Sequence, residues 1–100
     1  MTVQQLATRW LAHQKLYAKS KTYKGYAHSV RLIVGDFGHR RVESLNKRNL
    51  DAFVERLKLR GLAPGSINVH LRSFKALLNF GEKHGLIEIF LLRFRLPEFL

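Results

Sequence analysis

Apolar side chains recur at intervals of three and four residues in four separate stretches of this 100-residue chain. Each stretch is bounded by residues that typically start or stop helices. No stretch alternates between apolar and polar residues over the length of a strand, apart from a weak alternation at Phe94 and Leu96. The pattern therefore predicts an all-α domain of four helices with an extended C-terminal tail.

The first two predicted helices have recognisable boundaries. Thr2 and Gln5 have the spacing of a capping box, so the first helix begins after Thr2 and ends at the polar break around Ala18–Ser20. The second begins near Ser20 or Thr22, either of which can cap it, and ends at Gly38. The predicted buried faces are Val3, Leu6, Ala7, Trp10, Gln14 and Tyr17 in the first helix, and Tyr23, Tyr26, Val30, Ile33 and Phe37 in the second.

A loop over residues 39–45 separates this pair from two further predicted helices. Asn46 caps the third helix, which ends at Gly61, and Pro64 fits the first turn of the fourth, which ends at Gly85. The predicted core positions are Val42 and Leu45 in the loop, Leu50, Phe53, Val54 and Leu57 in the third helix, and Ile67, Leu71, Phe74, Leu77, Leu78 and Gly81 in the fourth.

The charge balance predicts a polyanionic partner. Eighteen Lys and Arg against seven Asp and Glu give a net charge of +11, which indicates binding to nucleic acid. Residues 1–35 hold six basic residues and residues 56–81 hold five, and neither block contains an acid. We therefore expect particular helices to face the polyanion.

Helical spacing places the basic residues in two rows. The second helix carries Lys21, Lys24, His28 and Arg31 opposite its predicted buried face. The fourth helix carries Asn68, Arg72, Lys75 and Asn79, which flank the outward side of its buried face. Arg and Asn side chains can bond base edges, so such rows suit a DNA groove. The third helix presents Asp51 and Glu55 outward, so we expect it to point away from DNA. The alternative is that both rows are only the solvated faces of amphipathic helices.

Hydroxyl side chains stand where the second and fourth helices begin. Thr22 and Ser66 can act as caps, and they can also contact a phosphate, which a helix N-terminus binds readily.

The residue types predict no catalytic site, no metal site and no cofactor. The chain has no cysteine, and its five histidines are spread one per element, so a solvated or DNA-facing role is expected for each. The acids form no paired arrangement, and Ser29 and Ser73 have no base at recognisable spacing. No apolar run is long enough for a membrane span and no signal core is present. We expect a cytoplasmic protein that is not an enzyme, with no small-molecule substrate and no membrane contact.

The order of four segments resembles the N-terminal core-binding domain, also called SAM-like, of tyrosine recombinases of the phage-integrase type. The segments are Ser20-Lys21-Thr22-Tyr23-x-x-Tyr26, Gly61-Leu62-Ala63-Pro64-x-Ser66-Ile67-Asn68, Leu71-Arg72-x-Phe74-Lys75-x-Leu77-Leu78 and Gly85-Leu86-Ile87. The resemblance covers about residues 2–88.

The resemblance implies a part in DNA integration or recombination. In this family the second and fourth helices meet the major groove of double-stranded DNA, Thr22 and Ser66 match hydroxyl positions that meet phosphate, and Lys75 matches a basic position. The family's catalytic residues belong to a separate C-terminal domain that this chain lacks, and the full-length protein would self-associate on DNA. His28 and Arg31 match the spacing of a catalytic His-x-x-Arg pair, but in the wrong domain, so we interpret the match as coincidence.

The C-terminal segment departs from the family pattern. Members usually show Asn-Pro shortly after the segment that matches residues 85–87, whereas this chain has Ile89-Phe90 and an apolar, Arg-punctuated tail. We expect residues 1–88 to form the DNA-binding domain and residues 89–100 to be a linker or the start of the absent catalytic domain. The tail could also fold back over Trp10 or Phe80. Two other functions stay open, a helix-turn-helix transcription regulator and a SAM-like protein-interaction module.

Overall fold

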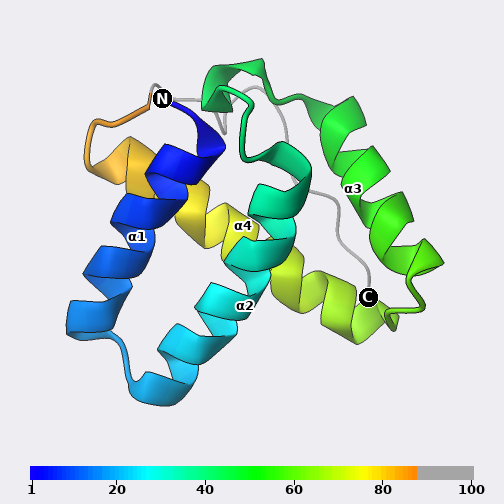
Figure 1. Cartoon of the computed structure of the whole chain (residues 1–100), viewed down its shortest axis with the longest axis horizontal. Helices are drawn as coiled ribbons and strands as arrows, with labels where there is room; N and C mark the ends of the chain where they lie inside the picture. The colour runs from blue at the N-terminus through cyan, green and yellow to red at the C-terminus, as the bar shows by residue number, and fades with distance from the viewer. Residues whose placement is uncertain (88–100) are drawn as a thin grey trace.

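A computed structural model describes residues 1–87 of the chain (Figure 1). It contains helices α1 (Val3–Tyr17), α2 (Ser20–Phe37), α3 (Lys47–Leu59) and α4 (Pro64–Lys83), with a 3-10 turn, η1, at Val42–Ser44. Within residues 1–87 there is no β-strand, and Thr2 pairs with Arg41 only in an isolated bridge. The predicted all-α class with four helices is confirmed, whereas the predicted tail lies outside the described residues.

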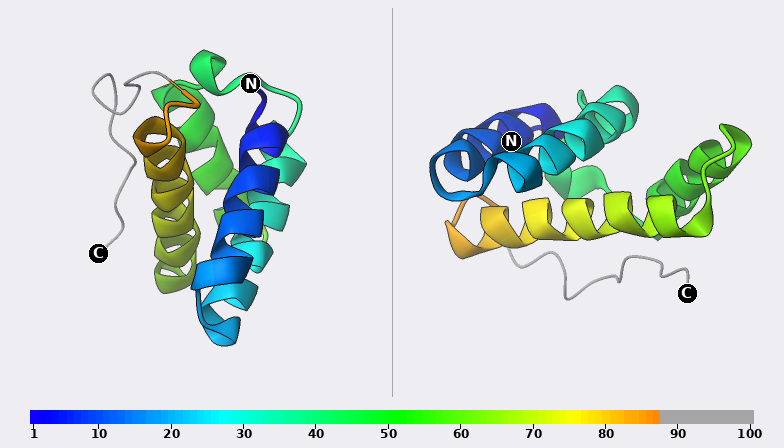
Figure 2. Two further views of the ribbon diagram at one scale, coloured as in Figure 1. Left: turned by 90° about the vertical axis from the view of Figure 1, so that its left-hand side faces the viewer. Right: turned by 90° about the horizontal axis from the view of Figure 1, so that it is seen from below.

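The helices form two layers. Figure 2 shows α1 and α2 side by side in one layer and α4 crossing beneath them in the other, with α3 beside the N-terminal half of α4. The N-terminal residues are hydrogen-bonded to the loop before α3. Val3 N donates to Arg40 O at 2.9 Å, and Val42 N donates to Met1 O at 3.0 Å. This arrangement leaves one side of α2 and one side of α4 open to solvent.

The core joins all four helices. The rings of Phe37, Phe53 and Phe74 have centroids 5.5–6.2 Å apart and bring α2, α3 and α4 together. Trp10 packs on Tyr26 at 4.6 Å and so joins α1 to α2. Every predicted core position of the loop, the third helix and the fourth helix is buried.

One predicted core position is wrong. Tyr17 is 76% exposed and its neighbour Leu16 is 78% exposed, because the last turn of α1 extends away from α4 (Figure 1). No element of the described chain covers that turn. Gln14, Tyr23 and Tyr26, also predicted to be buried, are partly exposed.

Two predicted helix starts are confirmed in atomic detail. Gln5 N donates to Thr2 Oγ1 at 3.1 Å and Thr2 N donates to Gln5 Oε1 at 2.9 Å, which completes a capping box. Asn46 and Asn49 form the same reciprocal pair at the start of α3. Pro64 occupies the first turn of α4, as predicted.

The predicted caps of α2 are wrong. Lys19 is the N-cap residue and accepts no hydrogen bond with its side chain. The Lys19 carbonyl already accepts a hydrogen bond from Tyr23 N at 2.9 Å, so Ser20 and Thr22 lie inside the first turn of the helix. Ser66 likewise does not cap α4, whose N-cap residue is Ala63.

Candidate nucleic-acid interface

The basic row of α2 consists of Lys21, Lys24, His28 and Arg31, and all four side chains are exposed. They lie on the side of the helix opposite the buried Val30, Ile33 and Phe37, because 3.6 residues complete one turn. The fold therefore leaves the whole predicted row on α2 accessible to a large ligand.

The polar row of α4 consists of Asn68, Arg72, Lys75 and Asn79. Arg72, Lys75 and Asn79 are exposed, whereas Asn68 is partly buried and interacts with other protein atoms. Asn68 is therefore less available to a ligand than the other three.

The basic row of α2 contacts α4 through His28, at the buried His70, which does not belong to the polar row of α4. His28 of α2 lies against His70 of α4, with ring centroids 5.3 Å apart. Figure 2 shows α2 and α4 in different layers, so a ligand that touched both rows would have to span the crossing of the two helices.

Within residues 1–87, no acidic side chain forms an ion pair with the basic residues of the rows. The ion pairs within residues 1–87 join Arg56 to Asp36 at 2.7 Å, and Glu43 to Arg41 and to the N-terminal ammonium. None of the row residues Lys21, Lys24, Arg31, Arg72 and Lys75 takes part in an ion pair with a described residue. Arg56 belongs to the second acid-free block of the sequence, but its charge is already paired.

The N-termini of α2 and α4 differ from those of α1 and α3. Helices α1 and α3 begin with complete capping boxes, whereas the N-cap residues of α2 and α4 accept no side-chain hydrogen bond. None of the four helices has an acidic residue in its first turn, and Thr22 and Ser66 are exposed in the first turns of α2 and α4. The two helices expected to meet DNA thus present first-turn N–H groups and a hydroxyl to solvent, which favours an anion.

Helix α3 presents its acids outward. Asp51 and Glu55 are both exposed, as the sequence predicts. Lys47 and Arg48 are exposed on the same helix, so its surface is of mixed charge. That α3 points away from DNA stays a prediction.

The expected solvated or DNA-facing role is wrong for His70. Its side chain is 5% exposed, and its Nδ1 lies 2.8 Å from Oγ of the fully buried Ser29, so Ser29 does have a base beside it. Burial, and secondarily the nearby charge of His28, lowers the pKa of His70 below 6.5. The two residues are 41 positions apart, so local spacing could not predict that they meet. The spacing of Ser29 from Ile33 and of His70 from Phe74 does place both residues on buried faces.

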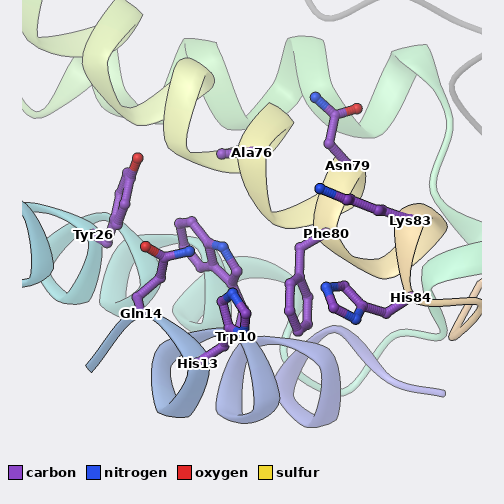
Figure 3. Close-up of a pocket in the computed structure, with 9 residues that line it drawn as sticks. All are labelled: Trp10, His13, Gln14, Tyr26, Ala76, Asn79, Phe80, Lys83 and His84. Carbon is purple, nitrogen blue, oxygen red and sulfur yellow. The ribbon is translucent and has the colours of Figure 1, made fainter. Parts of the chain in front are cut away.

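A pocket between α1, α2 and α4 was not predicted. It has a volume of about 310 Å³, and Figure 3 shows side chains from the three helices around it. Its lining residues are Trp10, His13, Gln14, Tyr26, Ala76, Asn79, Phe80, Lys83 and His84. Two of the histidines meet there, His13 and His84, with centroids 5.5 Å apart and the ring of Phe80 against both.

Two features are absent from residues 1–87. No group of three or more His, Asp or Glu side chains is placed to hold a metal ion. No described helix has the length and apolar character needed to cross a membrane.

Comparison of the chain with protein-family models, with curated proteins and with solved structures gives no match. The resemblance to the recombinase core-binding domain therefore rests on the sequence segments quoted above.

Proposed function

We propose that this domain binds double-stranded DNA through α2 and α4, as the DNA-binding part of a tyrosine recombinase. The observation that carries the proposal is that the five Lys and Arg side chains of the two rows form no ion pair with any residue in the described part of the chain (Lys21, Lys24, Arg31, Arg72, Lys75). A protein that neutralises DNA phosphates with Lys and Arg gains affinity because counterions are released.

The helix starts support the same proposal. Side-chain hydroxyls, backbone N–H groups and helix N-termini supply a large share of the phosphate contacts that position a protein on a duplex. Thr22 and Ser66 stand exposed beside the uncapped starts of α2 and α4. These groups would hold phosphates, while Arg72 and Asn79 lie on the face of α4 that would reach base edges.

A titration of a labelled duplex at several salt concentrations tests DNA binding. We expect a dissociation constant near the non-specific range of about 10⁻⁴–10⁻⁶ M at physiological salt. If about five phosphates are neutralised, the plot of log affinity against log salt should have a slope of roughly −4 to −5. A slope near zero would contradict the proposal.

Single substitutions test which face binds. Arg72→Ala and Lys75→Ala should each weaken duplex binding, while the helical circular dichroism signal is unchanged. Lys75→Ala, which removes a phosphate contact, should also reduce the salt slope by about 1. Asp51→Ala and Glu55→Ala on α3 are the matched controls and should not weaken binding. If they did, DNA would lie on α3 and the assignment of the face would be wrong.

The recombinase part of the proposal has its own test. The coding sequence that follows Leu100 should encode an Arg, a His-x-x-Arg pair and a Tyr in that order. A reading frame without this set would leave a DNA-binding domain of another class, such as a helix-turn-helix regulator, whose footprint would contain a palindrome.

A further inference from the structure

We propose that the pocket between α1, α2 and α4 binds a single nucleotide, stacking its base on aromatic rings and holding its phosphate with Lys83 and His84. The nucleotide could be part of a bound DNA strand, and that case rests on the proposed function. A free nucleotide would bind without it.

The floor and walls of the pocket are aromatic. Trp10 is 1% exposed, so it forms the floor of the pocket but offers no free ring face to a base. The rings on which a base can stack are those of Tyr26, which contacts Trp10, and Phe80, and both residues are partly exposed. Phe80 lines the opposite side and contacts His13 with a centroid separation of 5.2 Å. Base stacking on aromatic side chains contributes about 1–3 kcal/mol per base and tolerates any base. The aromatic part of the pocket thus fits a planar ring.

The rim of the pocket is polar and carries no acid. Five of its nine lining residues are polar (His13, Gln14, Asn79, Lys83, His84), and neither Asp nor Glu is among them. Lys83 and His84 are exposed, and Figure 3 shows the Lys83 side chain extending along α4 beside the pocket. An apolar ligand would leave these groups unused, so the lining favours an aromatic ligand that also carries an anion.

The size and position of the pocket favour a ligand no larger than one nucleotide. A volume of about 310 Å³ lies at the small end of the ~300–1,000 Å³ found for ligand pockets. Asn79 is the last residue of the polar row of α4, and Lys83 follows one turn later. A strand whose phosphates followed that row would reach the pocket with an unpaired nucleotide at its end.

Trp10 is the only tryptophan of the chain, so its fluorescence reports on the pocket directly. Deoxyadenosine 5′-monophosphate should quench Trp10 saturably, whereas deoxyadenosine alone and inorganic phosphate alone should bind more weakly. Lys83→Ala and His84→Ala should each weaken the nucleotide about tenfold, the loss expected for one charge-assisted contact. Arg48→Ala, which removes an exposed cation from α3, is the control and should change the affinity less than twofold. No saturable quenching, or equal quenching in all variants, would overturn the proposal.

A second comparison identifies the source of the nucleotide. A duplex with a one-nucleotide overhang should quench Trp10, and a blunt duplex of the same sequence should not. Quenching by the free nucleotide combined with no duplex binding would overturn the proposed function and assign the pocket to a free nucleotide. Duplex binding without quenching by the nucleotide or the overhang would overturn the pocket proposal and leave the proposed function standing.

Discussion

Ser29 Oγ and His70 Nδ1 lie 2.8 Å apart at the crossing of α2 and α4, and both side chains are buried. The hydrogen bond satisfies a polar group on each helix that would otherwise be removed from water without a partner. The same crossing carries the contact between His28 and His70, so it sets how the two candidate DNA-binding helices are oriented.

Removing the Ser29 hydroxyl should therefore destabilise the fold. Ser29→Ala leaves Nδ1 of His70 buried without its partner, and we expect a loss of about 1–3 kcal/mol in the free energy of unfolding. Chemical denaturation measures this loss. Ser73→Ala, at a buried serine on α4, is the control and should cost less, and equal losses would show that the hydrogen bond adds nothing.

The stability of the domain should fall as the pH is lowered below about 6.5. His70 has a lowered pKa in the folded protein, so the unfolded chain binds more protons than the folded one in this range. The stabilisation is complete above pH 6.5 and is lost as the pH falls through the folded-state pKa. Thermal melts at several pH values measure it. In His70→Asn, which cannot titrate, the pH dependence should be reduced, and an unchanged profile would assign it to other histidines.

The helix starts should respond differently to the loss of a polar side chain. Asn46→Ala removes a side chain that accepts a hydrogen bond from Asn49 N at 2.9 Å, and should cost about 1 kcal/mol of stability. Thr22→Ala removes no cap, because Lys19 is the N-cap residue of α2, and should leave the melting temperature nearly unchanged. If Thr22→Ala weakened duplex binding without a change in melting temperature, its hydroxyl would be a phosphate contact.

Substitution by alanine should have opposite effects on stability at Gly35, inside α2, and at Gly38, its C-cap residue. A Cβ at Gly38 would lie 2.6 Å from Val34 O and 2.9 Å from Val34 Cγ1, so Gly38→Ala should destabilise by roughly 1–3 kcal/mol. A Cβ at Gly35 meets nothing within 4 Å, so Gly35→Ala should stabilise the helix by about 0.5–1 kcal/mol. Denaturation curves of the two variants measure both effects. A Gly38→Ala protein as stable as the unsubstituted protein would mean that Val34 moves aside.

Local patterns were sufficient for most of the architecture. The four helices follow from apolar spacing, and glycines predicted to end three of them stand at the observed helix ends. Two of these glycines have backbone angles that favour glycine. Gly61 and Gly85 adopt positive φ angles of 85° and 69° just after α3 and α4. Gly38, the C-cap residue of α2, has a helical φ of −51°, and glycine is required there because a Cβ would lack space beside Val34.

The sequence by itself determined the helices, the buried stripes and the two rows of basic residues, because each of these depends on neighbours within one or two turns. The tertiary structure decided which residues from distant segments meet. It paired Ser29 with His70 and Arg56 with Asp36, and it gathered Trp10, His13, Phe80 and His84 around one pocket. It also exposed Tyr17, whose spacing matched the core, because burial requires a second element to pack against the stripe. Such contacts depend on how helices cross, and no local spacing specifies a crossing.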